Sequence, residues 1–221
     1  ASRQHITDGV HNSLRRLQTD HIDLLQIHRP DPNTPIEETL RALDDLVTAG
    51  KIRYIGCSNY AAWQLVEALH TSADSHLSRY VSIQPEYNLL TRGIEAEIVP
   101  VCQRYGVGVI PYSPMAAGFL SGKYKRGQDR PADARGGKRP SAYFDRWLTD
   151  RNYNAVDKLE PWVAERGHTL SELAIAWLLT RPAVSVVIVG ASRVEQIDAN
   201  VKATEWKLTP EEAKEVTELA G

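Results

Sequence analysis

The sequence predicts an α/β fold with a parallel sheet, and it favours a (β/α)8 barrel. Short runs rich in β-branched residues alternate with longer segments of helical periodicity. The centres of the first four runs, Leu24, Tyr54, Ile83 and Val109, are 26 to 30 residues apart, which suits one strand–helix–strand unit per step. Each run ends in polar residues, as strands do at the working face of a barrel. Strand ends are also polar simply because loops are exposed to solvent. This third observation therefore does not distinguish a barrel from other folds with a parallel sheet.

Five strands are expected. Their nearly continuous apolar character is typical of strands buried on both faces. A complete barrel has eight strands and about 250 residues, whereas this chain has 221. We therefore expect a truncated barrel that holds strands four to eight in a single domain across residues 1–221. The expected strands are residues 22–27, 52–57, 81–84, 107–111 and 185–189.

Helices are expected between the strands and after them. Thr34-Pro35 and Thr209-Pro210 each combine a capping hydroxyl with a proline suited to the first turn. Gly50, Gly106 and Gly167 mark helix ends. The expected helices are residues 6–18, 35–49, 61–70, 93–105, 153–166, 170–179, 194–202 and 209–219.

Composition narrows the class of protein. The chain has 26 Lys and Arg against 28 Asp and Glu, for a net charge of −2, so nothing indicates binding to nucleic acid. No apolar run approaches the roughly 18 residues of a membrane span. The two cysteines form no motif, and no signal peptide opens the sequence, so a cytoplasmic location is expected. The chain begins with Ala1 rather than Met, so we expect either a trimmed start or part of a longer chain.

Polar residues at the strand ends are candidates for chemistry. His28 could donate a hydrogen bond or act as acid or base, although a histidine bonded to loop backbone is equally plausible. Ser58, Asn59 and Gln84 offer two amides and a hydroxyl suited to a carboxamide ligand, but Asn59 could also cap the next helix. Tyr112 could stack on a heterocycle or belong to the core.

Two further segments could bind phosphate. Residues 190–193 lead into a helix, where backbone N–H groups and the Arg193 guanidinium suit an anion, and Ser192 could serve as the helix cap. Lys123 follows two glycines on a segment that could fold over an anion, or it is a solvated loop residue. The histidines have no metal-ligand spacing, and neither GxGxxG, a P-loop nor GxSxG is present in a suitable context.

Five ordered blocks resemble the aldo-keto reductase family, and within it the bacterial reductases related to potassium-channel β subunits. They are Tyr-Ile-Gly-Cys-Ser-Asn at 54–59, Ile-Gln-Pro-Glu-Tyr-Asn at 83–88, Ile-Pro-Tyr-Ser-Pro at 110–114, Gly-Phe-Leu-Ser-Gly-Lys-Tyr at 118–124 and Gly-Ala-Ser-Arg-Val-Glu-Gln at 190–196. The resemblance implies a (β/α)8 barrel that binds NADPH and reduces aldehydes or ketones without a metal. A small carbonyl substrate and a homo-oligomer are the expected partners.

The resemblance also implies roles for single residues. His28 matches the histidine that orients the carbonyl oxygen, where channel β subunits carry Asn, and this favours a reductase. Ser58, Asn59 and Gln84 match ligands of the nicotinamide carboxamide, and Tyr112 matches the aromatic ring against the nicotinamide. The residues that match phosphate and adenosine contacts are Ser113, Pro114, Met115, Ala116, Gly118, Lys123, Arg135, Gly190, Ala191, Ser192, Arg193 (2′-phosphate), Gln196 and Asn200.

The catalytic set of the family is only partly present. The Asp, Tyr and Lys of that set belong to the second and third barrel strands, which would precede this sequence. We therefore expect carbonyl reduction from the complete chain, whereas the 221 residues alone are expected to be inactive. The alternative is a non-catalytic module that binds NADPH or associates through the open edges of its sheet.

Overall fold

The structure is a computed structural model, and it describes residues 1–132, 134–138 and 142–221. Contacts divide the chain into two compact units. Unit 1 consists of residues 1–85 and 94–110, and unit 2 consists of residues 86–93 and 111–221. None of the described helices has the length and apolar character that crossing a membrane requires.

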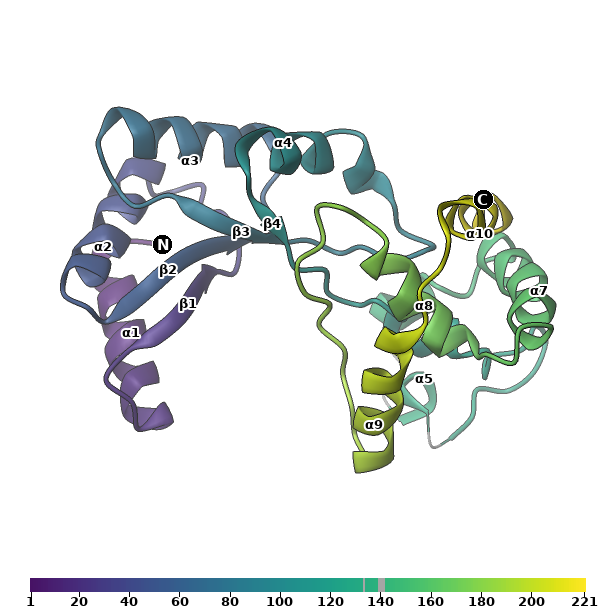
Figure 1. The fold of residues 1–221 in the computed structure, drawn as a ribbon. Helices are drawn as coiled ribbons and strands as arrows, with labels where there is room; N and C mark the ends of the chain where they lie inside the picture. Colours follow the sequence, from purple (N-terminus) through teal and green to yellow (C-terminus); the bar gives the residue numbers. More distant parts are fainter. Residues whose placement is uncertain (133, 139–141) are drawn as a thin grey trace. The chain divides into compact units, whose positions relative to one another are not determined.

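Unit 1 is built on a parallel sheet of four strands in the order β1-β2-β3-β4 (Figure 1). Leu24 on β1 pairs with Tyr54 on β2, and Ile83 on β3 pairs with Val109 on β4. The parallel sheet predicted from the strand spacing is therefore confirmed for the first four strands. They are β1 (Ile22–Ile27), β2 (Ile52–Ser58), β3 (Tyr80–Gln84) and β4 (Gly108–Val109).

Four helices of unit 1 lie along one face of this sheet (Figure 1). Leu43 from the helices and Ile55 and Ile83 from the sheet have no exposed surface and form the core between these layers. Tyr54 is 60 % exposed, so the expected burial of both strand faces is wrong for this part of β2. The helices are α1 (Arg3–Leu17), α2 (Ile36–Thr48), α3 (Ala62–Asp74) and α4 (Ile98–Tyr105), and a short 3-10 turn, η1 (Gly93–Glu95), precedes α4.

The helix expected over residues 93–105 is interrupted, and Pro100 explains where the regular helix begins. Proline lacks an N–H and is tolerated in the first turn, where that N–H would have no intrahelical acceptor. Because α4 begins at Ile98, Pro100 falls in its first turn. A helix starting at Gly93 would have placed the proline in the interior.

The fifth expected strand, residues 185–189, is not formed. These residues have no regular secondary structure, and Val186 and Ile188 are 54 % and 42 % exposed. Ile188 N–H donates to the backbone oxygen of Pro111 at 3.2 Å, but a single bond does not make a ladder. β-Branched residues favour an extended backbone, but a strand also needs neighbouring strands that accept and donate backbone hydrogen bonds along its length.

Unit 2 is mostly helical, and its long helices pack on one another (Figure 1). Thr169 and Thr209 cap α8 and α10 in reciprocal arrangements with Glu172 and Glu212, which accept from the threonine N–H groups at 2.7 and 2.9 Å. The elements are η2 (Ala116–Ser121), α5 (Arg135–Lys138), α6 (Ala142–Asp145), α7 (Asp150–Ala164), α8 (Leu170–Leu179), α9 (Val194–Lys202), η3 (Ala203–Glu205) and α10 (Pro210–Ala220).

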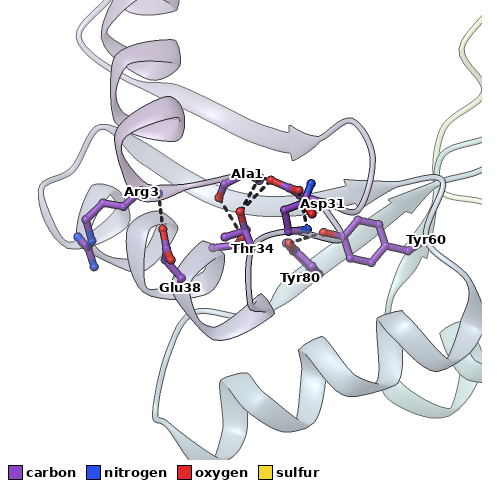
Figure 2. Close-up of polar contacts among 9 residues, drawn as sticks. Ala1, Arg3, Asp31, Thr34, Glu38, Tyr60 and Tyr80 are labelled. Carbon is purple, nitrogen blue, oxygen red and sulfur yellow. Dashed lines mark hydrogen bonds and ion pairs between the residues drawn. The ribbon is translucent and has the colours of Figure 1, made fainter.

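Polar contacts fasten the first residues of the chain to the start of α2 (Figure 2). The amino group of Ala1 forms an ion pair with Asp31, whose carboxylate also accepts from Thr34 Oγ1 at 2.8 Å. Arg3 N–H donates to Glu38 at 3.1 Å. These contacts hold α1 beside α2 in unit 1.

Candidate functional site

Four predicted residues meet at the carboxyl ends of β1, β2 and β3, and we call them the strand-end cluster: His28, Ser58, Asn59 and Gln84. Asn59 Nδ2 donates to the backbone oxygen of His28 at 3.0 Å and to Ser58 Oγ at 2.9 Å. Ser58 Oγ donates to the backbone oxygen of Gln84 at 2.6 Å. The predicted convergence of these strand ends is thus present within unit 1.

The parallel register produces this cluster. Ile27 pairs with Cys57, and Ser58 pairs with Gln84, so the residues that follow β1 and β2 reach the same edge of the sheet as the end of β3. Asn59 does not cap α3, which was the alternative left open by the sequence. Ala61 is the residue before α3, and its N–H donates to the Gln64 side chain at 2.9 Å.

A cavity of about 430 Å³ lies against β1 within unit 1. His28 and Gln26 line it from β1 and its end, while Val10 and His5 line it from α1. β1 is at the edge of the sheet, and no strand among the described residues pairs with its outer side. His28 is exposed and therefore accessible from this cavity.

One interaction beneath the cluster was not anticipated from the sequence. Ser82 Oγ on β3 donates to Gln26 Oε1 on β1 at 3.3 Å. The two side chains meet beside Gly56 on the intervening strand, where an added β-carbon would clash with Ser82 and approach Gln26 Cγ to 3.2 Å. The available signal was a glycine inside an apolar strand run, because such a glycine often marks a close approach of neighbouring groups.

The predicted coenzyme residues between Tyr112, expected at the nicotinamide, and Lys123, expected at the pyrophosphate, belong to unit 2 and lie in a loop of unusual backbone conformation. Ser113, Ala116 and Gly118 have φ values of 54°, 49° and 97°, in the left-handed region. Asn88 Nδ2 donates to the backbone oxygen of Ser113 at 3.0 Å, and Tyr112 forms a parallel bridge with Glu86. Because left-handed backbone is costly for residues other than glycine, these contacts hold a conformation that the local sequence does not favour.

Lys123 lies next to this loop. A β-carbon at Gly118 would be 3.7 Å from Lys123 Nζ, an ordinary van der Waals contact, so the lysine amino group lies close to this glycine. Pro114 is buried, and Met115 is half-buried in the same loop. Arg135 begins α5, but its side chain lies outside what the structure describes.

The second predicted phosphate segment, Gly190 to Arg193, precedes α9 in unit 2. Gln196 Oε1 accepts from Ser192 N–H at 2.7 Å and from Ser192 Oγ at 3.1 Å. Arg193, rather than Ser192, is the residue before the helix, so the interpretation of Ser192 as the cap is wrong. Gly190, Ala191 and Arg193 are exposed, and Asn200 is half-buried one turn beyond Gln196.

Two cations of unit 2 are available for an anion. Within the described part of the chain, neither Lys123 nor Arg193 has a carboxylate partner at ion-pair distance. By contrast, Lys125 pairs with Glu160 and Arg146 pairs with Glu86. The predicted site residues thus form two groups, one in each unit.

The two cysteines are unsuited to nucleophilic chemistry. Cys57 and Cys102 are free thiols and both are buried. Burial raises the pKa of Cys102 to about 11, and burial together with the neighbouring Cys102 raises the pKa of Cys57 further. Over the described residues, no group of three or more His, Cys, Asp and Glu side chains could hold a metal ion.

A parallel sheet with polar groups gathered at its strand ends fits the family suggested by the sequence blocks. A sequence model described as the aldo/keto reductase family matches residues 1–220. The chain belongs to the aldo-keto reductase family. Membership implies a (β/α)8 barrel, of which the described residues contain four paired parallel strands.

Several curated proteins are similar to this aldo-keto reductase chain. A probable voltage-gated potassium channel subunit beta from Oryza sativa is 41 % identical over 214 residues, which are 95 % of this chain and 65 % of the relative. A putative aryl-alcohol dehydrogenase from Schizosaccharomyces pombe is 36 % identical, covering 98 % of this chain and 60 % of the relative. A versiconal hemiacetal acetate reductase from Aspergillus parasiticus is also 36 % identical, covering 98 % and 62 %. The chain thus spans less than two thirds of the length of each of these relatives.

Proposed function

We propose that this chain is the carboxyl-terminal part of an aldo-keto reductase barrel, and that the complete protein reduces aldehydes or ketones with NADPH. The strands β1 to β4 would be the fourth to seventh strands of one barrel domain. The relatives' greater length supports the proposal that further strands belong to the protein. The observation that carries the proposed activity is the strand-end cluster beside an accessible histidine.

The strand-end cluster would hold the carbonyl substrate and the nicotinamide end of NADPH. His28 would donate a hydrogen bond to the carbonyl oxygen and orient it. Both Nδ2 hydrogens of Asn59 and the hydroxyl hydrogen of Ser58 already have protein acceptors. In this arrangement, the Ser58 hydroxyl oxygen would serve the carboxamide as a hydrogen-bond acceptor rather than as a donor.

The predicted residues of unit 2 are assigned to the coenzyme by their match to the family. The Tyr112 ring would lie against the nicotinamide, and the loop from Ser113 to Lys123 would surround the pyrophosphate, with Arg135 nearby. The segment from Gly190 to Ser192 would bind the adenosine side, Arg193 the 2′-phosphate, and Gln196 and Asn200 the adenine. When bound, NADPH supplies the hydride for carbonyl reduction.

The residues of unit 2 fit a phosphate-bearing ligand. Lys123 lies beside Gly118, and neither Lys123 nor Arg193 is neutralised by a described carboxylate. The Arg193 fork comes directly before α9, whose first-turn N–H groups add positive potential. Both features favour negative charge, as NADPH carries.

The coenzyme assignment is tested by replacing Arg193 with alanine and titrating the chain with NADPH and with NADH. We expect the NADPH dissociation constant to rise about 10- to 150-fold, because a charge-assisted hydrogen bond to phosphate is worth about 1.5–3 kcal/mol. Affinity for NADH should stay unchanged, because NADH lacks the 2′-phosphate. Fluorescence of the reduced nicotinamide provides the measurement.

Lys214→Ala is the matched control, because this exposed lysine on α10 has the same charge and lies outside the proposed site. An Arg193→Ala chain that binds NADPH as tightly as the original chain would contradict the assignment. An equal loss for NADPH and NADH would place Arg193 away from the 2′-phosphate.

A second prediction concerns turnover. The 221-residue chain should bind NADPH without oxidising it in the presence of an aldehyde such as nitrobenzaldehyde. The absorbance of NADPH measures its oxidation. The family's general acid is not among these residues, and a missing general acid alone forfeits about 10²–10⁴-fold in rate. Turnover at ordinary enzyme rates would refute this account of the catalytic set.

The competing proposal is a non-catalytic module that binds NADPH or a partner. The free edge of β1 and the relatives named as channel subunits favour it. It predicts that a chain carrying all barrel strands also binds NADPH without turnover, whereas the reductase proposal predicts carbonyl reduction from that longer chain. The reductase proposal also includes self-association of the protein and a cytoplasmic location.

A further inference from the structure

Asn59 has a backbone conformation that its position alone does not explain. Its φ is 60°, in the left-handed region, directly after the end of β2. Asparagine visits this region more readily than most residues, but the conformation persists only where surrounding contacts favour it. The hydrogen bonds of Asn59 therefore indicate which interactions its left-handed backbone makes possible.

Those contacts reach the ends of three strands. The side-chain amide donates to the backbone oxygen of His28 after β1 and to Ser58 Oγ on β2. The backbone N–H donates to the oxygen of Gln84 on β3 at 3.3 Å. One residue thus connects the carboxyl ends of β1, β2 and β3.

The bond to His28 has the greatest consequence, because β1 is an edge strand. Its ladder bonds run only toward β2, and its pairing with that strand ends at Ile27. His28 lies one residue beyond this last pair and is exposed. The hydrogen bond from Asn59 to the His28 backbone oxygen continues the link between β1 and β2 past the ladder.

We propose that Asn59 is a positioning residue that fixes the backbone of His28 relative to Ser58 and Gln84. This inference rests on the proposed function, in which His28 orients the carbonyl substrate. Asn59 acts here through the His28 backbone, in addition to any contact of its own with the coenzyme. The left-handed backbone of Asn59 turns its side-chain amide toward the end of β1. The costly backbone conformation and the hydrogen bond to His28 are therefore coupled.

The test compares Asn59→Gly, Asn59→Asp and Ser58→Ala by NMR of the protein labelled at its seven histidines. Glycine accepts the left-handed backbone but removes the donor to His28. Aspartate has a similar size, but a carboxylate oxygen would face the His28 carbonyl and repel it. Ser58→Ala removes both hydrogen bonds of the Ser58 hydroxyl, to Gln84 and from Asn59, and leaves the Asn59–His28 bond in place.

We expect the ring resonances of His28 to shift and broaden in both Asn59 variants, while the other six histidines keep their positions. Amide exchange at the carboxyl end of β1 should become about five times faster, as expected for the loss of one hydrogen bond. In Ser58→Ala, the His28 resonances should stay close to those of the original chain. A purely structural role of the cluster would instead disturb His28 equally in all three variants.

Gln18→Gly is the matched control, because Gln18 also has a left-handed backbone, with φ of 54°, at the end of α1. Unchanged His28 resonances in a folded Asn59→Gly chain would overturn the proposal, as would an equal change in Gln18→Gly. The readout needs no coenzyme, so absence of NADPH binding would count against the proposed function and not against the positioning role.

Discussion

Replacing Trp177 with alanine is expected to lower the free energy of unfolding by about 3–5 kcal/mol, the usual cost of removing a large buried aromatic side chain. Trp177 lies on α8 with none of its surface exposed. Its ring packs edge-on against Tyr87, with the centroids 5.3 Å apart, and the guanidinium of Arg181 lies 4.2 Å from its centroid. The substitution would leave a cavity where three segments of unit 2 meet.

A hydrogen bond adds to this loss. Trp177 Nε1 donates to Thr217 Oγ1 on α10 at 2.8 Å, which joins α8 to the last helix of the chain. Trp177→Phe retains most of the ring and removes the donor, so we expect it to cost about 1–3 kcal/mol, less than alanine. The difference between the two variants separates packing from hydrogen bonding.

Urea unfolding followed by circular dichroism measures both effects. Trp63→Ala is the control, because the Trp63 side chain is 65 % exposed and its removal should change stability by no more than about 0.5 kcal/mol. If Trp177→Ala and Trp63→Ala unfolded at the same urea concentration, the core of unit 2 would not be centred on Trp177.

Gly56→Ala is expected to destabilise unit 1 by about 1–3 kcal/mol through overpacking. A β-carbon at Gly56 would collide with Ser82 Oγ and would lie 2.9 Å from the Ser82 backbone oxygen. The hydroxyl can rotate away, but the backbone oxygen belongs to β3 and moves only with the strand. The Ser82–Gln26 hydrogen bond beside Gly56 should also be lost.

The same unfolding measurement tests this prediction against Gly9→Ala on α1. A β-carbon at Gly9 meets nothing within 4 Å, and alanine in a helix interior is favoured over glycine by about 0.5–1 kcal/mol. The two identical substitutions should therefore change stability in opposite directions. Adding Ser82→Ala to Gly56→Ala should recover part of the loss, and a Gly56→Ala chain as stable as the original would contradict the close packing of β1, β2 and β3.

The elements that the sequence predicted best are those whose signals are local. Thr209, Pro210 and Glu212 lie within one helical turn and form the start of α10 as expected. The first three strands were also found with small shifts of their ends, because their apolar runs are bounded by polar residues. Their spacing implied parallel neighbours, and the register confirms it.

The candidate site was predictable to a smaller extent. The sequence placed His28, Ser58 and Gln84 at strand ends, and the parallel register brings them together in unit 1. It left open whether Asn59 caps α3 or faces the site. The structure shows that Asn59 does not cap α3, and its side-chain amide donates instead to the backbone oxygen of His28, 31 residues earlier in the chain.

By itself, the sequence determined the capped start of α10, the positions of β1 to β3 and membership in a reductase family, since residues close together in the chain carry those signals. The caps expected at Thr34 and Ser192 are wrong, because Pro35 and Arg193 precede α2 and α9. Tertiary structure decided the contacts of Asn59 and Gly56 and left residues 185–189 without a ladder. The physical reason is that hydrogen-bond acceptors, strand neighbours and steric limits come from residues distant in sequence, and only folding brings them into contact.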